Sequence, residues 1–131
     1  MVSLFLERTA AVGLGGALGA IARYWLSGLV ARIGGHHSLP WGTLTVNLVG
    51  SFFLGVLLGA TVSGRLVMHP TLRTFAAVGL LGAFTTFSTF AYETLESMRA
   101  GDVRVAMLNV GASLFVGLAV AWVGLQVGER M

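Results

Sequence analysis

The chain has 131 residues, of which 56% are hydrophobic and only 10% are charged, and its mean hydropathy is +0.87. Soluble domains carry about 25% charged residues, so this composition excludes a soluble globular domain and indicates an integral membrane protein. The absence of cysteine excludes disulfides and thiolate chemistry. The net charge of +3 is too small a surplus to indicate nucleic-acid binding.

Long runs without charged residues predict four transmembrane helices. Three of these runs are uninterrupted and cover residues 33–64, 74–92 and 105–128. A fourth run begins at Thr9, is interrupted at Arg23 and continues to about Val30. Because one crossing of the bilayer core needs about 20 residues, we expect an all-α integral membrane fold with helices at about 8–30, 40–62, 72–98 and 103–127. No room is left for a soluble catalytic domain, so we expect one transmembrane domain over residues 1–131 and no enzyme activity.

The first predicted helix carries a cluster of glycines and one arginine. Gly15 and Gly19 lie four residues apart on one face, and this spacing predicts close packing against another helix. Arg23 follows on the same helix, where its charge is poorly suited to lipid. It could reach the membrane interface beside Tyr24 and Trp25, or it could raise the anion concentration at the mouth of a pore. The sequence leaves both roles open.

Small and polar residues recur every four positions along the second helix, as Asn47, Ser51, Gly55 and Gly59. Asn47 lies about two turns inside the membrane segment. An asparagine at this depth commonly hydrogen-bonds a neighbouring helix. The N–H groups of its amide could equally replace water around an anion.

The fourth helix repeats this spacing with Asn109, Ser113 and Gly117, and the stripe extends to Gly124. We expect it to be a packing face that also presents hydroxyl groups.

The third predicted helix contains the most informative segment, which reads GAFTTFSTF at residues 82–90. Its hydroxyl and phenyl groups lie within a charge-free run of 19 residues from Thr74 to Tyr92. Hydrocarbon offers hydroxyls no partner, so they must face protein, water or a solute. A glycine beside a threonine pair also favours a break in the helix, and irregular backbone at membrane depth is tolerated only where it lines a cavity. The segment therefore predicts a broken third helix and a polar site inside the membrane.

The chemistry of this segment favours an anion as the solute. Phe84, Phe87 and Phe90 recur every three residues, and the edge of a phenyl ring is electropositive. A cation site at this depth would more naturally recruit a carboxylate, and the sequence places none there. Glu93 follows the segment and could couple transport to protons, although a surface ion pair or a helix cap is the commoner role. Ordinary aromatic packing, with the hydroxyls bonded back to the helix, is the alternative reading.

The arginines divide equally between the two sides of the predicted topology. One side carries Arg8, Arg65, Arg73 and Arg130, and the other carries Arg23, Arg32, Arg99 and Arg104. The positive-inside rule therefore gives no preferred orientation. Either an additional factor sets one orientation, or copies insert both ways and pair as antiparallel dimers. Because four helices are too few to enclose a solvated path, we expect a homo-oligomer.

Three motifs resemble those of the Fluc (CrcB) family of fluoride channels. They are GGALGAxxRY at residues 15–24, WGTLxxNLxG at residues 41–50 and GxxTTFSTF at residues 82–90. The resemblance covers the whole chain, with all four helices in order. It implies a dual-topology antiparallel homodimer in the cell membrane, with two separate pathways by which fluoride leaves the cell down its electrochemical gradient.

The resemblance also implies which residues line these pathways. Asn47 would donate a hydrogen bond in the pore. Phe87 and Phe90 would present their ring edges, and each pore would take rings from both subunits. Hydroxyls along the path would come from Ser88, Thr89 and Ser113.

A structural Na⁺ on the dimer axis is a further implication of the resemblance. The backbone carbonyls of Gly82 and Thr85 would hold it, since carbonyl oxygens suit a hard cation and a two-fold axis turns two carbonyls into four. Arg23 would lie in the aqueous vestibule. Gly117 stands where some members of the family carry serine, which would shorten the polar track on the fourth helix.

Two other classes of membrane protein share part of this pattern. Small multidrug transporters are similar in helix count and dual topology, but that class looks to need an acidic residue in the first helix, where this chain carries Arg23. A non-transporting membrane subunit would leave the hydroxyls inside the membrane unexplained. We therefore expect a fluoride channel that contacts lipid, fluoride and a second copy of itself, and no nucleic acid.

Overall fold

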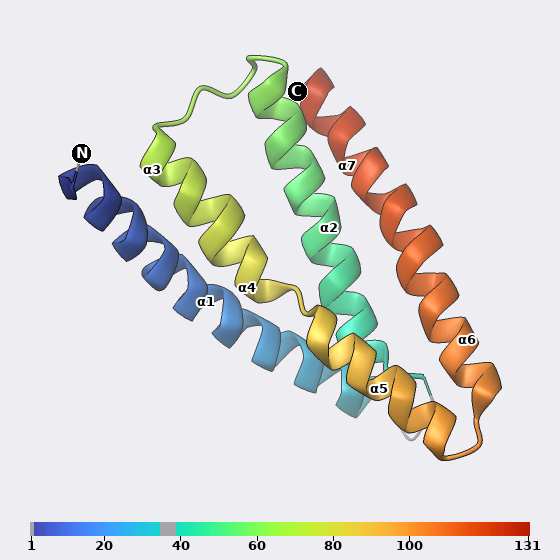
Figure 1. Cartoon of the computed structure of the whole chain (residues 1–131). Helices are drawn as coiled ribbons and strands as arrows, with labels where there is room; N and C mark the ends of the chain where they lie inside the picture. Colours follow the sequence, from blue (N-terminus) through green and yellow to red (C-terminus); the bar gives the residue numbers. More distant parts are fainter. Residues whose placement is uncertain (1, 35–38) are drawn as a thin grey trace.

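The computed structural model describes residues 2–34 and 39–131, and all regular structure in this part of the chain is helical (Figure 1). The first two membrane segments are α1 (Val2–Gly34) and α2 (Trp41–Val62). The third consists of α3 (Pro70–Arg73), the π-helix η1 (Thr74–Leu81), α4 (Gly82–Phe84) and α5 (Phe87–Arg99). The fourth consists of α6 (Val103–Gly111), the π-helix η2 (Ala112–Val116) and α7 (Gly117–Arg130).

Each of the four segments is long and apolar enough to cross a membrane. The prediction of an all-α, multi-pass membrane protein is therefore confirmed. The second, third and fourth segments begin and end within three residues of their predicted bounds. The first was predicted too short, because α1 begins at Val2 rather than residue 8 and ends at Gly34 rather than residue 30. Hydropathy marks the part of a helix that lipid covers, and no proline within α1 interrupts its continuation past Glu7 and Arg8.

A polar cap and two glycine turns mark the ends of helices at the two edges of the bundle. Asp102 accepts a hydrogen bond from the backbone N–H of Val105 at 3.2 Å and caps α6. Gly64 and Gly101 have positive φ values of 74° and 83°, which only glycine adopts without strain, and each follows the end of a helix. The two described ends of the chain lie toward the same edge, with the loop that follows α2 (Figure 1).

Glycines bring α2 and α7 into close contact along their length (Figure 1). A Cβ added at Gly55 or Gly59 would overlap carbonyl oxygens of α7, and one added at Gly124 or Gly128 would overlap carbonyl oxygens of α2. Small residues at such positions allow two backbones to approach closely in lipid. The packing role predicted for the fourth-helix stripe is confirmed at Gly124.

A second glycine contact joins α1 to η1 and α4. A Cβ added at Gly15 would lie 2.9 Å from the backbone nitrogen of Leu80, and one added at Gly19 would lie 3.1 Å from that of Phe84. Gly79 faces Gly15 from the other side of this contact. The close packing predicted from the spacing of Gly15 and Gly19 is therefore confirmed.

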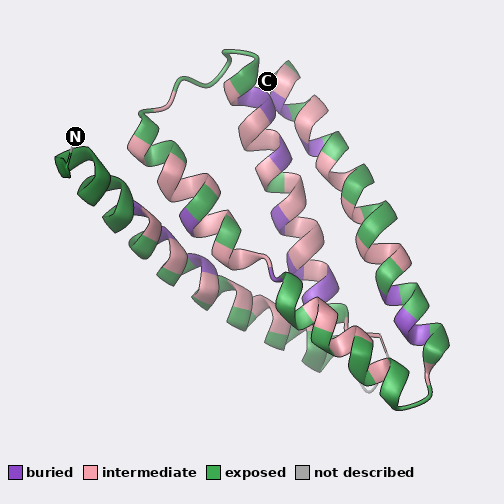
Figure 2. Cartoon of the chain, in the orientation of Figure 1, coloured by how far each residue is buried: buried purple, intermediate pink, exposed green. Residues whose placement is uncertain are grey.

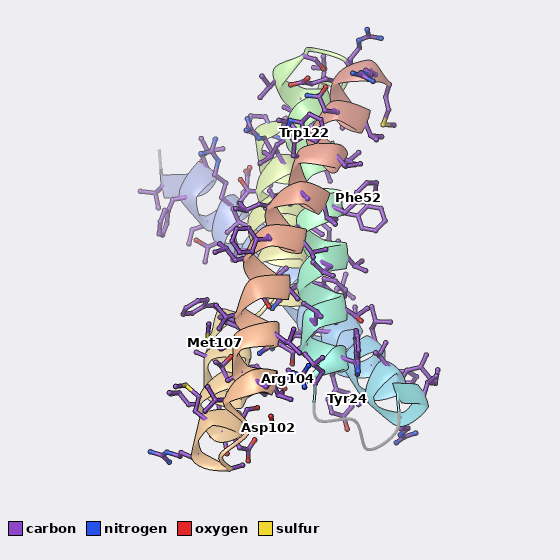
Figure 3. The ribbon with its side chains drawn as sticks, turned by 90° about the vertical axis from the view of Figure 1, so that its right-hand side faces the viewer. Tyr24, Phe52, Asp102, Arg104, Met107 and Trp122 are labelled. Carbon is purple, nitrogen blue, oxygen red and sulfur yellow. The ribbon has the colours of Figure 1, made fainter. Side chains whose placement is uncertain are left out.

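The interior of a single chain is small. Val46 and Asn109 are the largest fully buried side chains among the described residues, and large apolar side chains are exposed on all four segments (Figure 2). Two of these exposed side chains, Met107 and Trp122, are labelled in Figure 3. Because a membrane protein exposes apolar side chains to lipid or to another membrane chain, these surfaces suit both kinds of contact.

Candidate functional site

The helical backbone of the third segment is interrupted between α4 and α5. Thr85 (φ −87°, ψ 157°) and Thr86 (φ −149°, ψ 113°) have extended backbones, which suits their β-branched side chains. The Thr86 hydroxyl then caps α5 by accepting a hydrogen bond from the backbone N–H of Thr89 at 3.3 Å. Thr86 itself is only 8% exposed, so its peptide groups need partners inside the protein.

Asn47 of α2 supplies these partners. Its Oδ1 accepts a hydrogen bond from the backbone N–H of Thr86 at 2.7 Å, and its Nδ2 donates to the Thr86 carbonyl at 3.1 Å. The amide side chain thus replaces the two helical bonds that the interruption removes, and buried backbone groups need such partners. Nδ2 carries two hydrogens, so one N–H of Asn47 stays available to another acceptor.

A cavity of about 490 Å³ lies beside this contact, between α2, α5 and the junction of α6 with η2. Its polar walls come from Asn47, Ser51, Thr85, Thr86 and Ser113, and its aromatic walls come from Phe87 and Phe90. The remaining lining residues are Gly50, Leu54, Val110 and Leu114. Of the predicted pore residues, the structure thus brings Asn47, Phe87, Phe90 and Ser113 to one cavity.

The three phenyl rings do not share one environment. Phe87 and Phe90 have ring centroids 5.6 Å apart with planes inclined by 51°, and both line the polar cavity. Phe84 instead packs against Gly50, where a Cβ would lie 3.2 Å from its ring. It lines a separate cavity of about 680 Å³, whose described lining residues carry no hydroxyl or amide side chain. Phe87 and Phe90 therefore have polar neighbours, whereas Phe84 has mainly apolar ones.

The Ser113 hydroxyl is buried and has no hydrogen-bond partner among the described residues. Other helical hydroxyls, such as those of Thr94 and Ser97, donate to the carbonyl four residues earlier at 2.7 Å and 2.9 Å. Ser113 lies in η2, where the turns are wider than in an α-helix. Ser113 is among the residues that line the cavity, and its hydroxyl is left without a partner at the cavity wall.

Ser88 and Thr89 are exposed and lie outside the described lining of this cavity. The Thr86 hydroxyl connects them to it, since it lies 3.4 Å from the Ser88 hydroxyl and donates to the Thr89 hydroxyl at 2.9 Å. Thr89 lines a neighbouring cavity of about 350 Å³ together with Thr43 and Glu93. A row of hydroxyls therefore runs between the two cavities.

Glu93 accepts a hydrogen bond from the Thr43 hydroxyl at 2.8 Å. Its other carboxyl oxygen is buried without a partner among the described residues. Thr43 and Ser51 are two site residues that the sequence did not single out for such a role. Ser51 has a signal in its position four residues after Asn47, whereas the pairing of Thr43 with Glu93 joins residues 50 positions apart and has none.

Arg23 and Gly82 lie near the interruption but outside the polar cavity. The Arg23 guanidinium is 3.5 Å from the carbonyl oxygen of Thr85 and is partly buried, so Arg23 contacts the site from α1. Gly82 is exposed. The helical partner of its carbonyl would be the N–H of Thr86, which instead donates to Asn47. Among the described residues, the Gly82 carbonyl therefore accepts no hydrogen bond.

Comparison with known proteins agrees with this arrangement. A family model described as CrcB-like protein, Camphor Resistance (CrcB), matches residues 10–125. A protein of Hydrogenovibrio crunogenus named fluoride-specific ion channel FluC is 42% identical over 130 residues, which cover 99% of this chain and 97% of its own length. Proteins with the same name from Magnetococcus marinus and Thermus thermophilus are 48% and 46% identical over 119 and 126 residues.

The shared segments cover 90% of this chain and 94% of the Magnetococcus protein, and 96% of this chain and 98% of the Thermus protein. All three relatives are named as ion channels, which agrees with the expectation that the chain is not an enzyme. The family model spans most of the chain, and the relatives match it nearly from end to end. The chain therefore belongs to the CrcB-like family.

Proposed function

We propose that the protein is a passive fluoride channel of the cell membrane, which exports fluoride and so limits its accumulation in the cell. The observation that carries this proposal is the cavity beside the interruption, which offers amide, hydroxyl and phenyl groups and has no acidic residue in its described lining. Relatives named fluoride-specific ion channel FluC support the choice of ion. A cell interior that is negative favours exit of an anion by about 2.3 kcal/mol per 100 mV.

The groups around the cavity match the needs of a small anion. Fluoride must exchange its water for hydrogen-bond donors, and the free N–H of Asn47 and the unpartnered hydroxyl of Ser113 are two such donors. The edges of the Phe87 and Phe90 rings would add positive potential. The positive end of the α5 dipole begins at Phe87 and favours negative charge at the same place.

The hydroxyls of Ser88 and Thr89 would continue the path. The Thr86 hydroxyl connects both side chains to the main cavity. An ion that leaves the cavity would meet these hydroxyls before the second cavity beside Thr43. Ser88 and Thr89 would therefore act as a track between two wider regions.

We propose an antiparallel homodimer with two pores as the working unit. Phe87 is 78% exposed in the single chain, so one wall of its pore would come from elsewhere. Arg23 contacts the carbonyl of Thr85 inside the bundle, so the other arginines divide four to three between the two sides of the membrane. This small difference in charge gives only a weak preference for one orientation of the chain.

Two or three lysines added at the C-terminus should bias insertion and abolish function, and a copy with the opposite bias should restore it. Full activity of the biased variant alone would contradict antiparallel pairing.

A structural Na⁺ at the interruption fits the groups that the structure provides. Among the described residues no cluster of three His, Asp or Glu side chains can hold a metal ion, and carbonyl oxygens are suitable ligands for a hard cation. The Gly82 carbonyl has lost its helical partner to Asn47. The helical partner of the Thr85 carbonyl would be the N–H of Thr89, which instead donates to the Thr86 hydroxyl. We propose that these two carbonyls hold Na⁺ at the dimer interface, where the ion would neutralise converging carbonyl dipoles.

Substitution of Gly82 tests the Na⁺ proposal. A Cβ at this position would meet only the Ala77 carbonyl at 3.6 Å, an ordinary contact, so a single chain has room for the start of a larger side chain. Gly82→Leu should therefore weaken dimer assembly, or weaken the dependence of that assembly on Na⁺. Thr85→Ser keeps the carbonyl and should be tolerated. A Gly82→Leu protein that assembles normally and keeps its Na⁺ dependence would contradict the site.

Release of fluoride from liposomes that contain only this protein tests the proposed function. With a voltage set by a K⁺ ionophore and no proton gradient, fluoride should leave rapidly and chloride should leave little. Empty liposomes provide the baseline. Equal release of chloride, or a strict need for a proton gradient, would contradict a passive fluoride channel.

A further inference from the structure

α5 carries both pore rings, yet none of its 13 residues is buried (Figure 2). Apolar packing therefore does little to fix its position in a single chain. Three polar contacts from other helices reach this part of the chain: Asn47 with Thr86, Thr43 with Glu93, and Asn109 with Thr94. The first two belong to the site described above, and the third lies outside it.

Asn109 of α6 is 1% exposed, which is unusual for an amide side chain. Its Nδ2 donates a hydrogen bond to the Thr94 hydroxyl at 2.9 Å. The Thr94 hydroxyl in turn donates to the carbonyl of Phe90 at 2.7 Å. Because a hydroxyl has one hydrogen and two lone pairs, Thr94 makes both bonds at once and connects α6 to the turn of α5 that carries Phe90.

The register of the two helices places this contact next to the cavity. Thr94 lies four residues after Phe90, and Ser113 lies four residues after Asn109, so each pair lies on one face of its helix. Phe90 and Ser113 both line the cavity, while Asn109 and Thr94 join the helices one turn away. The distance between the Phe90 ring and the Ser113 hydroxyl therefore depends on the contact between Asn109 and Thr94.

We infer that Asn109 and Thr94 are positioning residues that set the width of the pore between Phe90 and Ser113, and with it the preference for a small anion over a larger one. The inference rests on the proposed function. Neither residue touches the ion, because neither lines the cavity. If the contact served only to stabilise the fold, its loss would lower the yield of folded protein and leave the anion preference of that protein unchanged.

The test uses the whole chain in four single variants and in the double variant of Asn109→Leu with Thr94→Val. Asn109→Leu and Thr94→Val remove the hydrogen bond with little change in volume, and Thr94→Ser keeps the hydroxyl. Thr61→Val is the matched control, because the Thr61 hydroxyl donates to the carbonyl of Leu57 at 2.6 Å within α2 and does not line the cavity. Two quantities are measured for each folded protein: the ratio of fluoride to chloride release from liposomes, and the hydrogen-exchange rates of the α5 amides in detergent.

Asn109→Leu and Thr94→Val should each lower the fluoride-to-chloride ratio and raise exchange in α5 by about threefold, the typical effect of one interhelical hydrogen bond in a membrane protein. Thr94→Ser and Thr61→Val should each keep the fluoride-to-chloride ratio and the α5 exchange rates of the wild type. The double variant should show no more than the larger single effect, because both substitutions remove the same bond.

A wild-type protein that passes fluoride, with Asn109→Leu and Thr94→Val variants that keep its anion ratio, would overturn the inference. If the wild type passes no fluoride, the proposed function fails. In that case unchanged α5 exchange in the two variants would show that the bond does not position the helix either.

Discussion

The pair formed by α2 and α7 and the segment α5 are held in place by different means. Glycines bring the backbones of α2 and α7 so close that no side chain fits between them at Gly55, Gly59, Gly124 or Gly128. By contrast, α5 has no buried residue, and hydrogen bonds from neighbouring helices connect it to the bundle. The first contact depends on shape along a whole helix, whereas the second depends on a few polar groups.

This difference suits a channel. Close backbone packing gives a fixed support, because it offers no alternative arrangement at low cost. Hydrogen-bonding groups such as the amide of Asn47 can instead serve the backbone and still offer a donor to an ion. The polar cavity lies beside the first half of α2, next to α5 and α6, while Gly55 and Gly59 in the second half pack α2 against α7.

Substitution at the glycine contact should have the largest effect. A Cβ at Gly128 would overlap the Val56 carbonyl and lie 2.7 Å from the backbone nitrogen of Ala60. Gly128→Val should lower the free energy of unfolding by about 3 kcal/mol, because neither backbone can move aside. Gly111→Ala is the control, since a Cβ there meets nothing within 4 Å. Unfolding of the purified proteins in detergent measures both, and equal stability would contradict the account of the α2 and α7 contact.

Removal of the Asn47 amide should have the next largest effect. Asn47→Leu breaks two hydrogen bonds and leaves the N–H and carbonyl of Thr86 unpaired at membrane depth. The free energy of unfolding should fall by about 2 kcal/mol, as expected for two hydrogen bonds of about 1 kcal/mol each. Fluoride flux per folded protein should also fall, because the N–H that is proposed to bind the ion is lost. Thr61→Val, in the same helix outside the cavity, should keep wild-type flux. Normal fluoride flux in the Asn47→Leu variant would show that Asn47 is not a pore residue.

Substitution of the three phenylalanines compares rings that line the polar cavity with a ring that only packs against its neighbours. Phe87→Ile and Phe90→Ile keep an apolar side chain but lose the ring edge, so flux should fall about fivefold to tenfold without loss of folded protein. Phe84→Ile should keep its flux, because Phe84 is not among the residues that line the polar cavity and lines a separate apolar cavity instead. If Phe84→Ile reduces flux as much as the other two, or if both ring variants conduct normally, the ring-edge role is wrong.

Loss of a single hydroxyl should have the smallest effect. Ser113→Ala removes a buried hydroxyl that has no partner among the described residues, so stability should change by less than about 0.5 kcal/mol. Flux should fall about threefold if the hydroxyl binds the passing ion. A stability loss without a change in flux would show that Ser113 only supports packing.

The sequence predicts the parts of this molecule that depend on neighbouring residues in the chain. Charge-free runs place the helices, and the spacing of Gly15 and Gly19 predicts a contact that the structure contains. The pairing of Asn47 with Thr86 and of Thr43 with Glu93 joins residues 39 and 50 positions apart, and local patterns carry no such information. The wide turn of η2 that frees the Ser113 hydroxyl likewise has no evident signal in its sequence ASLFV.

The first helix shows the same limit at its ends. Hydropathy marks the stretch that lipid covers, so the prediction stopped at residues 8 and 30, although the helix continues to Val2 and Gly34. Arg23 shows the same limit of sequence-based prediction for a single side chain. Its place beside the Thr85 carbonyl depends on how α1 crosses the third segment, which its sequence context does not specify.

The reversal potential of a bilayer with fluoride on one side and chloride on the other tests the central claim most directly. A path whose main cavity offers hydrogen-bond donors, and has no acidic residue in its described lining, should give a potential set by the fluoride gradient. That potential should stay the same when a pH gradient is added. A potential that follows chloride, or one that shifts with the pH gradient as proton-coupled transport requires, would contradict the account.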